Sequence, residues 1–313
     1  MADFCCFGGK IMFIQIIGSL QLGLLYAAMA MGVFVTFRIL DIADLTVDGS
    51  FVTGMATAAV VTIAANNPVL GILAGTAAGG LAGLITGLLL TKVKVPPILA
   101  GIITMTGLYS INMFIMGEKS NLSLVGQETV FTWVCKASPL NDEIDKLILS
   151  ALIIAAVAAI LAVFFKTRPG MAIRATGDNE EMVRSSSINA DVSKCLGIVI
   201  ANACVGLSGS LICQYQMFSD VGYGTGMVVI GLASIIIGES ICGRRGVGVG
   251  ILSACVGSAV YRIIIALALR FEIFPSYALK LISAVIVALS IAIPTAKKAI
   301  GNARMKSQRR NVQ

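Results

Sequence analysis

The residues best able to do chemistry in this 313-residue chain are carboxylates gathered in two short segments. In the first, RILDIADLTVDGS, Arg38, Asp41, Asp44 and Asp48 recur at spacings of three and four residues, so a helix there would align them on one face. Charged groups near a membrane normally face water, a partner charge or a transport path. A helix at the membrane interface with its wet side outward explains the pattern equally well, and the sequence leaves both interpretations open.

The second segment, GDNEEMVRSSSIN, occupies residues 177–189 within the polar stretch 166–194. An Asp or Asn cap followed by acids in the first turn is a normal way to begin a helix, so the segment predicts a short one. The stretch is too polar to cross a membrane, and its composition alone indicates a solvated connector.

Other kinds of chemistry lack the residues they need. The eight cysteines show no CxxC spacing and the chain has no histidine, so we expect neither a metal site nor disulfides. Without histidine, the usual base of a nucleophilic triad is also missing, and we find no cluster of nucleophile, base and acid for a membrane enzyme. There is no GxxxxGK[ST] loop, so the chain cannot hydrolyse ATP by that route.

The elements that carry these segments are membrane-spanning helices. Hydrophobic residues make up 57% of the chain, and several apolar runs approach or exceed the ~20 residues that cross a bilayer. We expect an all-α polytopic membrane protein, a single transmembrane domain over residues 1–313 with eight to ten helices. The run 228–238 is too short for a full crossing, so it predicts a broken helix after the glycine-rich turn 222–226. The other expected spans are 11–35, 69–90, 98–116, 147–165, 195–215, 247–269 and 275–293. The stretch 38–48 is a cytosolic bend, a re-entrant half-helix or the start of the second span.

Basic residues orient these spans. They cluster at 92–94, 166–194, 244–245 and 297–310, which the positive-inside rule places in the cytosol. Residues 117–146, where acids outnumber lysines, then form an outer loop, and residues 297–313 form a basic cytosolic tail. The rule also accounts for the net charge of +7, so we expect no nucleic-acid partner. The side of the N-terminus stays open.

A row of glycines repeats every fourth residue through one span. In lipid, small residues at this spacing let another helix approach closely and pack tightly. The row therefore predicts helix packing, with a permeation role as the lesser alternative. It consists of Gly71, Gly75, Gly79, Gly83 and Gly87.

The segment 177–189, the turn 222–226 and the run ICGRRGVGVG at 241–250 together resemble the permeases of the branched-chain amino acid and ribose-type ABC importers. The layout is similar over most of the chain. In that family, a glycine, Asn-Glu-Glu and a Gly-Ile-Asn element form a coupling helix that docks into the ATPase subunit. The resemblance assigns the coupling role here to Gly177, Asp178, Asn179, Glu180, Glu181, Arg184, Ile188 and Asn189. Ser187 stands where many members have glycine, a departure we expect to matter little.

The run DLTVDGS at 44–50 is similar to the start of the family's second span, which lies near the substrate passage. Its form with Asp48 resembles the branch associated with tryptophan and tyrosine uptake. Candidates for the substrate path are polar residues on otherwise apolar helices: Asp44, Thr46, Asp48, Asn112, Asn202 and Gln214. For the last three, a hydrogen bond between helices is the favoured interpretation.

The resemblance implies the permease subunit of an ATP-driven importer in the bacterial plasma membrane, which moves a small solute inward by alternating access. Hydrophobic or aromatic amino acids are the leading cargo, with sugars or nucleosides behind. The implied partners are a cytosolic ATPase subunit holding ATP and Mg²⁺, a second permease copy or sibling, an external binding protein and lipid. This chain itself needs no cofactor.

Two points of this interpretation stay open. The outer stretch 117–146, with Phe131 and Trp133 for apolar contact, is either a docking surface for the binding protein or simple cover for the outer mouth. An ion-coupled secondary transporter is the rival function, and inverted repeats or acids deep in the bilayer would favour it. We find neither clearly, and Arg262 and Lys280 can both be placed toward the outer interface.

Overall fold

A computed structural model describes residues 2–137, 142–243 and 246–270, together with 284, 285 and 288. The expected span 275–293, the basic tail 297–313 and Arg244 and Arg245 lie outside the described residues, apart from those three positions. Eight of the described helices are long and apolar enough to cross a membrane, which confirms the prediction of an all-α polytopic membrane protein.

The long helices are α1 (Ala2–Phe34), α2 (Thr46–Ala65), α3 (Pro68–Thr91), α4 (Pro97–Ile115), α6 (Asp142–Phe164), α9 (Ala190–Gln216), α10 (Met227–Cys242) and α11 (Val247–Arg270). Shorter elements are the π-helical turn η1 (Val35–Ile39), α5 (Val130–Ala137), α7 (Arg168–Asp178), α8 (Glu180–Ser185) and the 3₁₀ turn η2 (Val221–Gly224). Strands β1 (Asn121–Ser123) and β2 (Phe218–Asp220) form a small antiparallel ribbon in which Leu122 pairs with Ser219.

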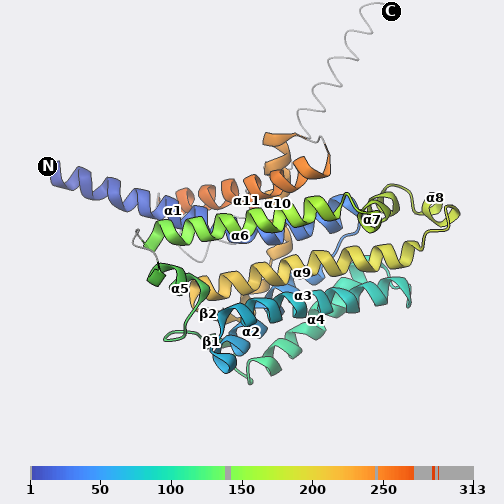
Figure 1. The fold of residues 1–313 in the computed structure, drawn as a ribbon, viewed down its shortest axis with the longest axis horizontal. Helices are drawn as coiled ribbons and strands as arrows, with labels where there is room; N and C mark the ends of the chain where they lie inside the picture. The colour runs from blue at the N-terminus through green and yellow to red at the C-terminus, as the bar shows by residue number, and fades with distance from the viewer. Residues whose placement is uncertain (1, 138–141, 244–245, 271–283, 286–287, 289–313) are drawn as a thin grey trace, which may run out of the picture.

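The helices form two groups that meet along α9. In Figure 1, α1, α6 and α11 lie on one side of α9, and α2, α3 and α4 lie on the other. The short helices α7 and α8 lie at one end of the bundle, while α5 and the ribbon lie at the opposite end. By the charge rule these ends are the cytosolic and outer ends.

The charged stretch 38–48 is a bend followed by the start of the second span. Helix α1 continues through η1, residues 40–45 are not helical, Asp41 has a φ of +54°, and α2 then begins at Thr46. The stretch is therefore two of the three alternatives left open, a bend and the start of a span, and its charged residues do not share one helix face. Its side chains instead diverge to three partners: Arg38 pairs with Glu239, Asp44 contacts Asn202, and Asp48 contacts the start of α10.

The glycine row of α3 faces α9 and α2. A Cβ added at Gly79 would lie 2.6 Å from the Asn202 carbonyl oxygen, and one at Gly83 would lie 2.7 Å from the Ile198 carbonyl oxygen. At Gly75 it would lie 2.5 Å from the Gly54 carbonyl oxygen of α2. Because these neighbours are backbone atoms, the three helices approach one another as closely as glycine permits.

Helix α10 is too short to cross a membrane by itself. Its 16 residues span about 24 Å at ~1.5 Å per residue, short of the ~30 Å hydrocarbon core. It follows η2 and Gly226, whose φ of +88° favours glycine, so the predicted broken helix after a glycine turn is observed. Irregular backbone at membrane depth is stable only where protein buries it or it lines an aqueous cavity.

Candidate transport path and coupling segment

A buried polar layer joins the start of α2 to the middle of α9. The Asn202 amide nitrogen donates to the Asp44 carboxylate at 2.7 Å, and the Ser50 hydroxyl donates to the Asn202 amide oxygen at 2.6 Å. The Thr46 backbone N–H donates to the other Asp44 oxygen at 2.9 Å. Three of the six path candidates thus meet, and they satisfy one another.

The layer continues to α3 and α4 through threonine hydroxyls. Thr46 and Thr86 lie 2.7 Å apart at their hydroxyl oxygens, and Thr86 donates to Thr104 at 2.9 Å. All of these side chains are buried. The hydroxyl chain ties α2, α3 and α4 at one level of the bundle.

We predict that Asn202→Leu destabilises the protein by about 2 kcal/mol, because it leaves one oxygen of the buried Asp44 carboxylate without its donor and removes the Ser50 hydroxyl's acceptor on Asn202. Reversible unfolding in mixed micelles measures the effect. Ser208→Ala is the matched control, since it removes one buried hydrogen bond to the Leu25 carbonyl and strands no carboxylate. Equal loss in the two variants would contradict the layer's role.

Asp48 caps the broken helix. Its two carboxylate oxygens accept from the backbone N–H groups of Gly226 at 2.9 Å and Val228 at 2.8 Å, at the positive end of the α10 dipole. Beside it lies a hollow of about 160 Å³, which Asn112 also lines. Asp48 and Asn112 therefore share one space, apart from the polar layer of Asp44 and Asn202.

Gln214, the sixth path candidate, lies elsewhere. Its amide nitrogen donates to the Pro68 carbonyl at 2.7 Å, and its amide oxygen accepts from the Val130 N–H at 3.2 Å. These bonds fasten the outer ends of α9, α3 and α5. The favoured interpretation from sequence, a hydrogen bond between elements, fits this geometry.

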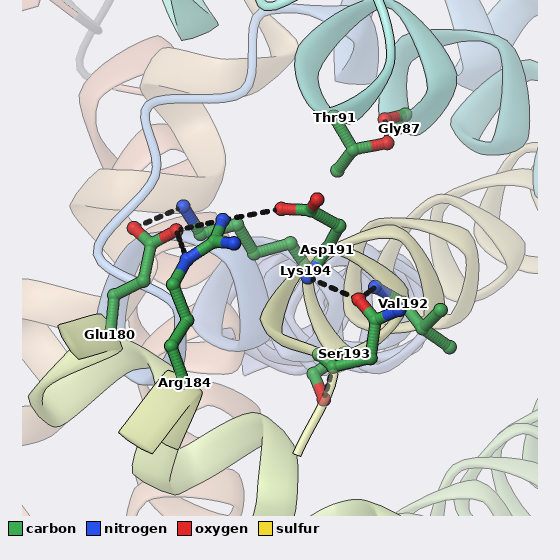
Figure 2. Close-up of polar contacts among 9 residues, drawn as sticks. Gly87, Thr91, Glu180, Arg184, Asp191, Val192, Ser193 and Lys194 are labelled. Atoms are coloured by element: carbon green, nitrogen blue, oxygen red, sulfur yellow. Dashed lines mark hydrogen bonds and ion pairs between the residues drawn. The ribbon is translucent and has the colours of Figure 1, made fainter. Parts of the chain in front are cut away.

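Ion pairs hold the predicted coupling segment, residues 177–189, in shape, as Figure 2 shows. Glu180 on α8 accepts from Lys194 on α9 at 2.5 Å and from Arg184 at 2.9 Å, and Arg184 also pairs with Asp191 at 2.7 Å. Hydrogen bonds from Lys194 and then from Arg184 hold the pKa of Glu180 below its usual value. The ion pairs of Glu180 with Lys194 and Arg184 are therefore fully present at neutral pH, and they are lost only as the pH falls through that lowered pKa.

The residues to which the resemblance assigns coupling divide into a set that shapes the segment and an outward set. Asn179 caps α8 by accepting from the Met182 N–H at 3.0 Å, and Asn189 caps α9 by accepting from the Asp191 N–H at 3.1 Å. Gly177 packs against the backbone of Ile39 and Leu40, where an added Cβ would lie 3.0 Å from the Leu40 Cα. These residues shape the segment.

The outward set is exposed on the cytosolic end. It comprises Asp178, Glu181 and Ile188, and Glu181 takes no part in the ion pairs that the described residues form. Met182, which sequence reasoning missed, is 54% exposed on the same short helix. An apolar side chain beside an exposed acid is a surface suited to a protein partner.

Ser187 adopts a φ of +62°, in the left-handed region that glycine enters freely. A non-glycine residue there costs about 1 kcal/mol. The departure from glycine that the sequence shows therefore carries a conformational cost, and the expectation that it matters little for coupling stays a prediction.

A cytosolic cleft of about 320 Å³ lies next to the coupling segment. In its wall, the Arg38 guanidinium donates to both Glu239 oxygens at 2.6 Å, joining η1 to the end of α10, while Arg174 and Asp178 line the α7 side. Sequence reasoning missed this pair because its members are 201 residues apart. The cleft links the coupling segment to the cytosolic end of the broken helix.

The outer stretch differs from expectation at one residue. Phe131 is buried, and its ring lies edge-on to Tyr215 at a centroid distance of 5.6 Å. The prediction that Phe131 offers apolar contact to a partner is therefore wrong. Its apolar ring belongs to the core because α5 packs onto α9. Trp133 is partly exposed, and its indole N–H donates to Glu128 at 2.6 Å.

Comparisons with known proteins agree with this architecture. The family model described as "Branched-chain amino acid transport system / permease component" matches residues 15–293. The tyrosine transport system permease protein of Clostridioides difficile (strain R20291) is 36% identical, over 88% of this chain and 90% of its own. The ribose import permease protein RbsC of Escherichia coli (strain K12) is 26% identical, over 64% of this chain and 61% of its own.

Among solved structures, PsaBC from Streptococcus pneumoniae in complex with Fab has a similar fold, with a TM-score of 0.51 at 13% identity over 88% of this chain and 89% of that chain. The eight apolar helices and the family match together place the protein in the plasma membrane as a multi-pass protein. The chain belongs to the family of branched-chain amino acid transport system permease components, the membrane subunits of ABC-type transport systems.

Proposed function

We propose that this permease imports an aromatic amino acid, with tyrosine as the first cargo to test, and that a separate ATPase subunit binds its coupling segment. The 36% identity to a tyrosine transport system permease over 88% of the chain carries the choice of cargo. The exposed face of Asp178, Glu181, Met182 and Ile188 is the surface offered to the ATPase, on which ATP and Mg²⁺ are bound.

A second permease copy or a sibling subunit completes the path in this proposal. The hollow at Asp48 is bordered by Thr106 and Tyr109 on the exposed face of α4. A carboxylate that faced lipid there would be unfavourable, whereas a path between two permeases supplies water. An external binding protein delivers the cargo to the outer end, where Trp133 and Glu128 are exposed.

The test combines the purified permease, its ATPase subunit and its binding protein in proteoliposomes with labelled L-tyrosine. We expect tyrosine uptake that requires ATP inside the vesicle, together with ATP hydrolysis stimulated by tyrosine-loaded binding protein. Affinity purification from native membranes should recover an ATPase subunit that has a phosphate loop.

The rival function predicts the opposite pattern. Uptake by the permease alone, driven by an ion gradient and indifferent to ATP, would replace the proposal with a secondary transporter. ATP-dependent uptake of ribose in place of tyrosine would keep the mechanism and overturn the cargo.

A further inference from the structure

We propose that the hollow beside Asp48 binds the ammonium group of the cargo, with Asp48 and Asn112 as its hydrogen-bond acceptors. The inference rests on the proposed function, because it assigns a binding site to the amino acid that the permease would move. Neither the polar layer nor the coupling segment contributes to this hollow.

Asp48 is held in a fixed position, and its carboxylate can still accept further hydrogen bonds. The backbone N–H groups of Gly226 and Val228 hold one oxygen each, and a carboxylate has about four acceptor positions. The carboxylate lies at the positive end of the α10 dipole. The carboxylate is thus both anchored and able to accept from a cation in the hollow.

Asn112 supplies a second, independent sign of a ligand. The residue is only 1% exposed, and its amide oxygen has no hydrogen-bond partner, while its amide nitrogen donates to the Gly49 carbonyl at a long 3.4 Å. Buried acceptors without partners are rare because each costs about 1–3 kcal/mol. A donor in the hollow would satisfy this oxygen.

The lining matches a cation in charge and chemistry. Asp48, Asn112 and the Thr106 hydroxyl, which donates its own proton to the Ile102 carbonyl, all present acceptors. Lysine and arginine are absent from the described residues that line the hollow. A primary ammonium, with three donors, a positive charge and no acceptor, complements such a lining better than a neutral sugar hydroxyl does.

The size indicates which part of the cargo enters. The hollow of about 160 Å³ is close to the ~150 Å³ of a cavity that holds one benzene ring. It admits the ammonium end of an amino acid but not the entire molecule. Tyr109, 59% exposed at the border of the hollow, is placed to contact the aromatic ring that stays outside.

The test measures tyrosine transported per ATP hydrolysed in proteoliposomes that hold permease, ATPase and tyrosine-loaded binding protein. Asn112→Leu removes the free acceptor without touching the α10 cap, and Asp48→Asn removes the charge. Asp220→Asn is the matched control, since Asp220 accepts from the Gly222 N–H at 2.7 Å in the same turn but does not line the hollow.

We expect Asn112→Leu and Asp48→Asn to lower tyrosine uptake about tenfold while stimulated ATP hydrolysis stays within about twofold of wild type. Asp220→Asn should keep the wild-type ratio. An unchanged ratio in Asn112→Leu, or uptake and hydrolysis that fall together in both variants, would overturn the ammonium site and leave Asp48 as a helix cap alone. Absence of uptake and hydrolysis in the wild type would instead refute the proposed function.

Discussion

Replacing Gly79 and Gly83 by leucine is expected to abolish the folded permease. A single added Cβ already falls 2.6 Å from the Asn202 carbonyl oxygen at Gly79 and 2.7 Å from the Ile198 carbonyl oxygen at Gly83. Backbone atoms cannot rotate away, so α3 must separate from α9, and overpacking of this kind costs several times the ~1–3 kcal/mol seen in adaptable cores. Fluorescence-detected size-exclusion chromatography of a tagged variant should show loss of the monodisperse peak.

The control for this prediction lies on the neighbouring span. Gly107 on α4 has no atom within 4 Å of an added Cβ, so Gly107→Leu should give a wild-type elution profile. Gly80→Ala, whose Cβ would lie 3.5 Å from the Ala203 side chain, should also be tolerated. A monodisperse Gly79→Leu, Gly83→Leu protein would show that α3 does not need the close approach.

Glu181→Lys is expected to release the ATPase subunit and to reduce ATP-driven uptake by tenfold or more. Glu181 is exposed and lies outside the ion-pair network, so its reversal changes the charge of the outward face while the ion pairs of Glu180 and Arg184 stay in place. Reversing a charge at an interface places like charges together and disfavours binding by several kcal/mol. Co-purification of the ATPase with tagged permease measures the effect.

Variants of Glu180 and Glu118 distinguish a loss of segment structure from a loss of direct contact with the ATPase. Glu180→Gln breaks the ties to Lys194 and Arg184, so we expect weaker binding that is accompanied by loss of stability, a combination that Glu181→Lys should not show. Glu118→Lys makes the same change at the outer end and should retain the ATPase. If the Glu181→Lys variant retained the ATPase fully, the proposal that this face binds the ATPase would be wrong.

The spans and the family were predictable because their signals are local. Apolar runs near 20 residues, the basic clusters between them and the segment 177–189 are each contained in a short stretch of sequence. The glycine row of α3 was predictable for the same reason, because residues four apart share one helix face. Which helices this face meets, α9 and α2, follows only from the structure.

Features that depend on distant residues were not predictable. The Arg38 and Glu239 pair joins positions 201 residues apart, and nothing local marks either partner. Which of the alternatives for 38–48 holds was not predictable either, because contacts with α9 and α10 draw Asp44 and Asp48 to different sites. Phe131 is an aromatic residue of the kind that often contacts partners, but it is buried because it packs against Tyr215.

The backbone contact of Gly177 with Ile39 and Leu40 has a consequence for the energetics of the transport cycle. It joins the segment offered to the motor to the bend that leads directly into Asp44 and Thr46. Free-energy coupling between two binding sites is reciprocal, so a motor that alters cargo affinity through this contact has its own affinity altered by cargo to the same factor. The ATPase subunit would thus bind an empty permease and a cargo-loaded permease with different affinities, so the occupancy of the path would be sensed at the cytosolic end.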